Sequence, residues 1–360
     1  MLYSPCYRFA QFKGKSCIFP FLRYFMDIFY PKYYDQFSCI AAACPDSCCK
    51  EWSVDVDSES AALYRSLPGA LGDRLRQVLE DTDDRTIMTI ENGRCPMWQY
   101  DGLCRIHKEL GHDALCQVCR DFPRLRHDYG TFTELGLELS CPEAARFILT
   151  APDFGWVAHS VPDDEAPEYD TEAMETLLRS RKEFSHFLES AELSFPDFLT
   201  CLLIYAHQVQ AELDGDEPAA SPSATLCHDL PILPHAGGMN ALKAFFRELE
   251  ILTPQWESRL SAPSAIPQWN DRHKALLHYF LCRYWLQAVS DHDLISRVKL
   301  AVAACLLIGH LGGDLTETAQ LFSKEIENDP DNVEAILDGA YTTPALTDGN
   351  LLKILQEATL

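Results

Sequence analysis

The stretch at positions 39–49 reads CIAAACPDSCC and holds four of the fifteen cysteines of this 360-residue chain. Nine of the fifteen lie between residues 39 and 141, namely Cys39, Cys44, Cys48, Cys49, Cys95, Cys104, Cys116, Cys119 and Cys141. Thiolates are soft ligands that suit zinc, copper(I) and iron–sulfur clusters. The pattern therefore predicts a metal centre. Because some of the ligands lie far apart in sequence, the metal would also act as a staple for the fold.

The location of the protein follows from what the sequence lacks. No stretch approaches the roughly 20 apolar residues of a membrane span, and no secretory signal opens the chain. These absences predict a cytoplasmic protein with no membrane partner. In a reducing cytosol, an odd number of clustered cysteines favours metal binding or redox chemistry over a disulfide framework. The alternatives are buried free thiols that serve as small apolar residues, and disulfide-bonded or metal-free cysteines.

The charge of the chain is uneven. The net charge is −24, with +4 in residues 1–25, −8 in residues 26–150 and −20 in residues 151–360. Such an acidic surface repels a phosphate backbone, so nucleic acid is excluded as a partner. A hydrophobic content of 47% is enough to bury a core in each of about two domains.

The first 25 residues differ from the rest of the chain. They hold four basic residues, no acidic residue and no sustained periodicity. We expect residues 1–25 to be a non-native or disordered extension, with translation starting at Met26 in place of Met1. The alternative is a basic arm that binds a partner.

Residues 26–150 are expected to fold into short elements between the cysteines. Asp57 and Ser58 can cap a helix from about Glu59, and Pro68-Gly69 separates it from a second helix. Alternating patterns predict short strands at Thr86–Glu91 and Thr131–Leu139. A further helix is expected from Cys141-Pro142 to Leu149, since proline is tolerated in the first turn.

The remainder of the chain is expected to be helical. Pro152–Pro167 has the composition of a linker, and residues 214–234 have that of a long surface loop. Helical periodicity predicts helices at 171–191, 196–214, 238–252, 271–290, 294–311 and 315–327, with a short pair at the C-terminus. The predicted fold class is mainly α: an irregular cysteine-rich metal-binding domain with short strands at 26–150, followed by an α-helical domain at 168–360.

Several enzyme signatures are missing. There is no G-x-G-x-x-G, no P-loop and no G-x-S-x-G, so the sequence gives no support for a Rossmann-type cofactor site, phosphate binding or serine hydrolysis. The glycines Gly309, Gly312 and Gly313 follow an apolar helical run and are expected to end a helix. The Cys-x3-Cys-x2-Cys spacing of radical S-adenosylmethionine enzymes is also absent, because the third position is Glu51.

Several motifs together resemble the flagellin lysine-N-methylases. They are Pro31–Cys39, Cys44–Cys49 with Trp52 and Asp55–Asp57, Cys95-Pro96, Gly102–His107, Cys119–Arg124 and Ser140–Glu143, with Phe322–Glu327 and Asn332–Leu337 near the C-terminus. The resemblance spans about residues 27–340. Part of the pattern is also similar to a wider group of zinc- or iron-chelating cysteine-cluster proteins.

This resemblance implies methyl transfer from S-adenosylmethionine to lysine side chains of flagellin, with an iron–sulfur cluster of the 4Fe-4S type as cofactor and zinc as the alternative metal. The cysteines that match the family are the nine named above, among which Cys116 matches less closely. Nine thiols exceed the four ligands of one cluster, so either two centres exist or some cysteines are structural.

Candidate residues for the rest of the site follow from the chemistry. Lysine must lose a proton before it attacks a methyl group, and candidate bases are Tyr100, Asp101, His107, Asp121 and His127. Residues 94–127 carry a net charge of +2, and Arg124 or Arg126 could bind the carboxylate of S-adenosylmethionine. The alternatives to an enzyme are a chelating module without activity and an electron-transfer or metal-delivery protein.

Overall fold

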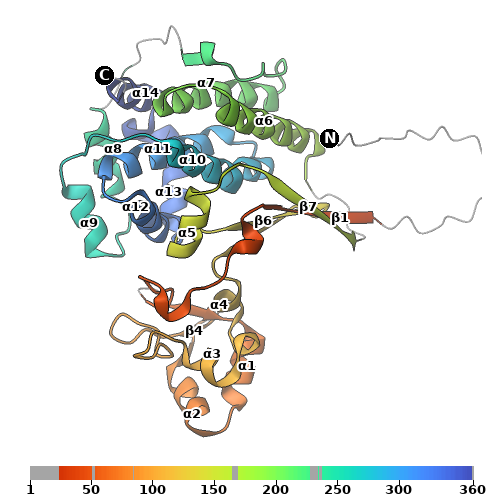
Figure 1. Ribbon diagram of the computed structural model, residues 1–360, viewed down its shortest axis with the longest axis vertical. Coiled ribbons are helices and arrows are strands. Elements are labelled where there is room, and N and C mark those ends of the chain that lie inside the picture. The colour runs from red at the N-terminus through yellow and green to blue at the C-terminus, as the bar shows by residue number, and fades with distance from the viewer. Residues whose placement is uncertain are drawn as a thin grey trace, which may run out of the picture.

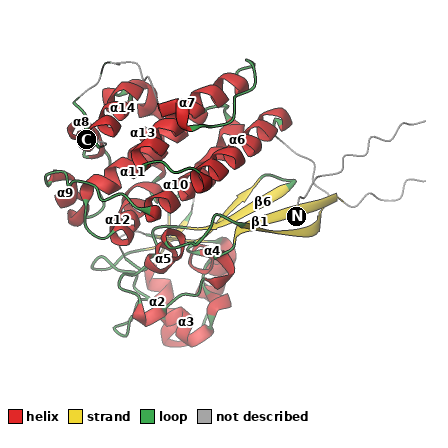
Figure 2. Ribbon diagram, turned by 45° about the horizontal axis from the view of Figure 1, so that its top comes forward, coloured by secondary structure: helices red, strands yellow, loops and turns green. Residues whose placement is uncertain are grey.

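The structure is a computed structural model that describes residues 24–50, 53–83, 85–163, 169–227, 234 and 237–358. A large helical domain carries a small domain at one end, and a four-stranded sheet lies at the junction (Figures 1 and 2). The mainly α character predicted from the sequence is confirmed. Residues 1–23 of the predicted extension lie outside the described residues.

The sheet at the junction has the strand order β5-β6-β1-β7. Its strands are β1 (Tyr24–Pro31), β5 (Arg124–Asp128), β6 (Phe132–Leu137) and β7 (Trp156–Asp163). Strand β1 pairs in parallel with β6 and antiparallel with β7, so that Ile28 faces Thr133 on one side and His159 on the other. The sheet therefore joins segments that are more than 100 residues apart in sequence.

Two sequence predictions change at this sheet. The prediction of a linker at Pro152–Pro167 was wrong for its central part, because β7 pairs with β1 along eight residues. Polar composition alone could not reveal the strand, since β7 lies at the edge of the sheet and its partner is remote in sequence. The pairing of β1 with β7 also begins at Tyr24, two residues before the expected start at Met26.

The small domain consists of short elements around a modest core. Helices α1 (Ser58–Ser66) and α2 (Gly69–Val78) confirm the predicted pair, and the Asp57 carboxylate accepts the N–H of Ser60 at 2.9 Å as the cap of α1. The other elements are the sheet β2-β4-β3 (Val54–Val56, Thr86–Met88, Leu79–Asp81), helices α3 (Arg105–Leu110) and α4 (Gln117–Asp121), and the 3₁₀ turns Tyr34–Gln36, Ala41–Ala43 and His112–Ala114.

The helical domain largely follows the predicted pattern. Its helices are α5 (Pro142–Leu149), α6 (Thr171–Ser190), α7 (Phe195–Leu213), α8 (Met239–Phe246), α9 (Pro254–Ser261), α10 (Asp271–Tyr284), α11 (Leu294–Leu311), α12 (Leu315–Phe322), α13 (Pro330–Thr342) and α14 (Asp348–Glu357). Shorter turns occupy Ala224–Cys227, Trp285–Ser290 and Pro344–Leu346. The last turn of the predicted helix 315–327 widens into a π-helix, η6 (Ser323–Glu327). Helix α9 was not predicted from the sequence.

Helix α11 is the centre of this domain. Every residue from Leu294 to His310 is buried, and α7, α10, α12, α13 and α14 pack around it. The helix ends at Gly312, whose φ of +68° favours glycine, as predicted for this glycine cluster. A Cβ atom on Gly309 would lie 2.3 Å from the ring of Trp269, so this glycine allows close packing of the ring against the helix. The expectation that Gly309 helps to end the helix was therefore wrong.

Helix α11 also corrects the expectation that no segment approaches a membrane span. Its 18 residues are long and apolar enough to cross a membrane, and among the described residues it is the one helix that meets this criterion. In the fold, 89% of this window is buried by protein. Such burial is what the core helix of a helical domain requires.

The buried side chains form two separate cores. The smaller core takes residues from Val54 to Cys116, whereas the larger one combines Phe37, residues from Phe132 onward and the helical domain. Strands β1 and β6 and helix α5 thus contribute to the core of the helices, although they lie almost entirely within residues 26–150. The cysteine-rich core is therefore narrower than the range expected from the sequence.

Candidate functional site

Three of the predicted metal ligands stand at the starts of helices. Cys104 precedes α3, Cys116 precedes α4 and Cys141 precedes α5, each as the N-cap residue. The N–H groups at a helix start point toward the preceding side chain and favour a thiolate there. Metal-bound sulfur ligands are stabilised by such N–H groups, so these positions suit a metal site.

Six cysteines gather in the small domain: Cys48, Cys49, Cys95, Cys104, Cys116 and Cys119. A hydrogen bond between the neighbouring thiols lowers the pKa of Cys48 to about 7 and raises that of Cys49. The same relation holds for Cys116, whose pKa is lowered, and Cys119, whose pKa is raised. Cys95 and Cys116 are part of the smaller core, and Cys49 and Cys104 pack against it, so these four cysteines lie in one part of the small domain.

Cys39, Cys44 and Cys141 form a second group at the junction of the two domains. Burial raises the pKa of Cys141 to about 11, and the charges of Cys44 and Cys39 add to this effect. Burial also raises the pKa of Cys44, which lies within electrostatic reach of both Cys39 and Cys48. The nine cysteines thus form a group of six and a group of three. Cys44 of the group of three lies within electrostatic reach of Cys48 of the group of six, so this pair connects the two groups.

The donor set fits a metal that prefers sulfur, but its geometry is not that of a formed site. Among the described residues, no three Cys, His, Asp or Glu side chains converge closely enough to hold a metal ion. Burial raises the pKa of Cys95 to about 11, so this thiol stays protonated unless a cation replaces the proton. Which cysteines bind a metal therefore remains a prediction.

Asp46 fastens the first cysteine stretch to the helical domain. Its carboxylate binds Lys50 at 2.7 Å, Lys324 of η6 at 3.1 Å and Gln320 of α12 at 2.9 Å. Although burial alone would raise the pKa of Asp46, the hydrogen bond from Lys50 and the charge of Lys324 lower it to about 2. This anchor could not be predicted from the sequence, because its two partners in the helical domain lie more than 270 residues away.

A cleft of about 610 Å³ opens between the two domains beside this anchor. Cys48 and Cys119 line it from the small domain, and Lys324 and Glu325 line it from the π-helical turn η6. Turns of this kind are rare and often occur at functional sites. A second hollow of about 520 Å³ continues the cleft, and the two share Asp55, Arg85, Val118, Phe122 and Glu138.

The two arginines predicted to bind S-adenosylmethionine have different surroundings. Arg124 lines the smaller hollow, with its guanidinium 5.3 Å from the centre of the Phe37 ring. Arg126 is exposed on the same strand and binds the carboxylate of Asp128 at 2.7 Å. Among the residues that line the two hollows, only Arg124 of this pair is present.

Four of the predicted bases lie on the surface of the small domain. Asp121 lines the smaller hollow, whereas His107 lies against His112 on α3 and its neighbouring turn. Tyr100 is fully exposed, and Asp101 pairs with Lys108. Of these four, Asp121 is therefore the one that the fold brings to the cleft.

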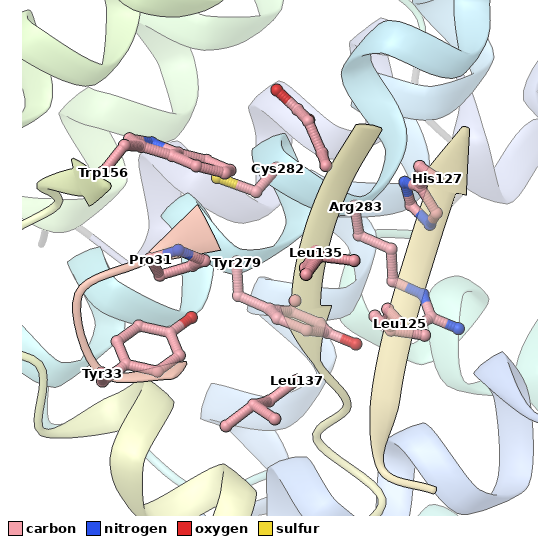
Figure 3. A pocket seen from close by; sticks show the side chains of 12 residues that line it. Pro31, Tyr33, Leu125, His127, Leu135, Leu137, Trp156, Tyr279, Cys282 and Arg283 are labelled. Atoms are coloured by element: carbon pink, nitrogen blue, oxygen red, sulfur yellow. The ribbon is translucent and has the colours of Figure 1, made fainter. Parts of the chain in front are cut away.

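The fifth predicted base, His127, lines a separate cavity between the sheet and α10. Figure 3 shows this cavity, with His127 and Arg283 on one side and Tyr33, Trp156 and Cys282 on the other. Its volume of about 30 Å³ fits little more than a water molecule. Burial lowers the pKa of His127, so its ring is neutral near pH 7. The cavity is too small for a substrate.

Glu138 is a site residue that the sequence did not indicate. It follows β6, lines both hollows, and its side chain is 12% exposed. Burial raises the pKa of its carboxyl group, while the charge of Arg283 lowers it. In the sequence, Glu138 is an ordinary polar position at the end of a strand, and only the fold places it in a cleft.

Comparison with named proteins identifies relatives that are similar in sequence to this chain. The flagellar biosynthetic protein FliU of Salmonella muenchen is 33% identical over 136 residues, which are 34% of this chain and 77% of FliU. The chain belongs to the FliU family. The lysine-N-methylases of Salmonella typhimurium and Salmonella choleraesuis are each 32% identical over 136 residues.

These matches cover only part of this chain and only part of each lysine-N-methylase. The chain covers about a third, 32%, of the length of each lysine-N-methylase. The matches cover 34% of this chain, which is less than the span of residues 27–340 expected from the motifs. No model of a protein family matches the chain. No solved structure matches it either.

Proposed function

We propose that this FliU relative transfers methyl groups from S-adenosylmethionine to lysine side chains of flagellin, with an iron–sulfur cluster as its cofactor. The observation that carries the proposal is the similarity to lysine-N-methylases and to a flagellar biosynthetic protein. Two features of the fold support it. The thiols gather beside a cleft, and that cleft is large enough for a cofactor and a lysine side chain together.

The metal in this proposal is held by cysteines from one or both groups. The group of six offers more than the four ligands that one four-iron cluster needs, and the group of three at the junction could hold a second centre. When bound, a cluster supplies a redox-active metal centre next to the cleft. Zinc is the alternative metal, because it also prefers thiolate ligands.

The protein's own residues would bind and orient the two substrates. Arg124 is suited to the carboxylate of S-adenosylmethionine, since a guanidinium can bind a carboxylate through two hydrogen bonds. The apolar and acidic side chains of the larger hollow suit the stem and the amine of a lysine.

The cytoplasm is the proposed location, because the thiols need reducing conditions before they bind a metal. The acidic surface of residues 151–360 would attract lysine-rich regions of a partner and repel nucleic acid. Flagellin is the proposed partner on the strength of the relatives' names.

The decisive experiment combines metal analysis with a transfer assay. Protein purified without oxygen is analysed for iron, zinc and sulfide, and is then incubated with purified flagellin and S-adenosylmethionine. We expect iron, sulfide and methylated lysines detected by mass spectrometry. Colourless, zinc-loaded protein that methylates no flagellin would favour a chelating module. A reversible redox couple without methylated product would favour an electron-transfer protein.

Two variants test the arginine assignment within that assay. Arg124→Ala should weaken binding of S-adenosylmethionine by about 1.5–3 kcal/mol, as expected for lost hydrogen bonds to a charged group. Arg126→Ala is the matched control, because Arg126 has the same side chain on the same strand but binds Asp128. Equal losses in both variants would contradict the placement of the cofactor in the smaller hollow.

A further inference from the structure

The larger hollow of the cleft has the chemistry of a lysine-binding channel. Ile87 and Val118 of the small domain and Leu252 and Pro330 of the helical domain provide apolar walls. The lining also contains carboxylates, and its acidic residues outnumber its basic residues. A lysine side chain has the complementary form, since a long apolar stem ends in a cationic ammonium group.

Of the five carboxylates in this lining, three are already engaged, and a fourth, Glu250, is exposed to solvent. Asp55 binds Arg85 at 3.2 Å, and Asp329 caps α13 by accepting the N–H of Asp331 at 3.0 Å. Glu325 accepts the N–H of Leu252 at 2.8 Å and the hydroxyl of Thr253. These carboxylates have structural roles and are poorly placed to exchange their partners for a substrate.

Glu138 differs from them in its position and in its charge balance. Its closest cation is Arg283, at 3.9 Å, which is beyond hydrogen-bond distance. Arg283 also binds the fully buried Glu327 at 3.0 Å. One guanidinium therefore faces two carboxylates, and these three groups together carry a surplus negative charge, with Glu138 as the member that lines the cleft.

The location of Glu138 fits the transfer geometry. It lines both hollows, so a group bound to it lies where the larger hollow meets the smaller one that contains Arg124. The same cleft is lined by Cys48 and Cys119. An amine at Glu138 would thus lie between the proposed cofactor site and the thiols.

We propose that the larger hollow binds the substrate lysine and that the carboxylate of Glu138 pairs with its ammonium group. This inference rests on the proposed function and adds the entry route of the substrate and the residue that recognises it. A bound ammonium group would neutralise the surplus negative charge next to Arg283, whereas a neutral side chain would not. This difference provides the selectivity for a cation.

The test measures binding and does not depend on methyl transfer. A short peptide with one lysine and the same peptide with Nε-acetyl-lysine are titrated against the purified protein, with fluorescence anisotropy as the readout. The wild type should bind the lysine peptide at least about tenfold more tightly, the worth of one hydrogen bond to a charged group. Glu138→Gln should abolish this preference, because it keeps the shape and removes the charge.

The matched control is Glu334→Gln, which removes the same charge from an exposed position on α13 outside both hollows. It should keep the tenfold preference. If Glu138→Gln keeps the preference as well, the inference is overturned. If the protein prefers the lysine peptide over the acetyl-lysine peptide but methylates no flagellin, the proposed function is overturned and the assignment of the lysine site is retained.

A second measurement uses the unmodified protein, in case Glu138→Gln does not fold. A carbodiimide joins a carboxylate to a nearby amine as an amide, so the lysine peptide can be cross-linked to its contact. We expect peptide mapping to place the amide at Glu138, and excess acetyl-lysine peptide should not compete. Cross-links confined to exposed carboxylates outside the cleft would sink the proposal.

Discussion

The small domain and the helical domain are held together in different ways. The helical domain is built around α11, which is buried along almost its whole length and surrounded by five helices. The small domain has a core of few side chains, and two of them, Cys95 and Cys116, are cysteines. A hydrophobic core in a domain of this size supplies only about 3–5 kcal/mol. A metal held by the cysteines, as proposed above, would add to the stability of this small core.

The two regions also differ in their ion pairs. In the helical body, Arg181 of α6 binds Glu134 of β6 with both side chains at most 10% exposed, which ties the sheet to the helices. Glu327 accepts hydrogen bonds from the hydroxyls of Tyr279 and Tyr284 in the same interior. The small domain pairs its charges at the surface, as Arg65 does with Asp81. Electrostatic pairing should therefore matter more in the helical body.

The largest expected effect is that of removing the proposed metal, which should destabilise the small domain and leave the helical domain folded. Serine at both Cys48 and Cys49, or treatment with a chelator, should unfold the small domain, because a structural metal contributes on the order of 10 kcal/mol. Hydrogen exchange with mass spectrometry should show rapid exchange in α1 and α2, while α11 stays protected.

Cys227→Ser is the control for that experiment, since Cys227 lies in the turn Ala224–Cys227 outside both cysteine groups. It should leave exchange in α1 and α2 unchanged. Full protection of α1 and α2 after metal removal would show that the small core is sufficient by itself.

The second effect concerns the buried pair in the helical body. Arg181→Met leaves the carboxylate of Glu134 buried without its partner and should reduce the free energy of unfolding by about 3–5 kcal/mol. Urea denaturation measures this change. The double variant Arg181→Met with Glu134→Leu should recover most of the loss, because no uncompensated charge remains.

The matched variant in the small domain is Arg65→Met, whose pair with Asp81 is at least 42% exposed on both sides. Exposed pairs contribute at most about 1 kcal/mol, so this loss should be small. Equal losses for Arg65→Met and Arg181→Met would remove the electrostatic difference between the two regions.

The third effect is a pH dependence of stability located in α10, and it grows as the pH falls. Burial lowers the pKa of His273 to about 4 and that of His278 to about 3. Below pH 6.5 the unfolded chain binds protons at these rings that the folded chain does not bind. The free energy of unfolding should therefore fall by about 1.4 kcal/mol per pH unit for each histidine as the pH decreases from 6.5 to 4.

His278→Phe isolates one of these two contributions. The ring of His278 stacks on Phe154 at 4.0 Å, lies 3.6 Å from the sulfur of Cys282 and is near the charge of Arg181. Phenylalanine keeps the stacking and cannot bind a proton, so the slope of stability against pH should fall by the contribution of one histidine, about 1.4 kcal/mol per pH unit. An unchanged slope would mean that His278 does not resist protonation in the fold.

The sequence predicted the part of the candidate site that depends on composition and spacing. It named nine cysteines as metal ligands, and this assignment stays a prediction. It also named Arg124 and Asp121, which the fold brings to the cleft. It missed Glu138, Asp46 and Lys324, because their partners lie 145 to more than 270 residues away. Sequence spacing contains no signal for such contacts.

Local signals determined most of the helices. The cap at Asp57, the proline that opens α5 and the glycine that ends α11 each act within a few residues, so they could be read directly from the sequence. Only the tertiary structure decided that β7 pairs with β1, that strands β1 and β6 contribute to the core of the helices, and that a cleft opens beside the cysteines. These features depend on pairing and packing between distant segments, and the free energy of such contacts is set by the whole fold.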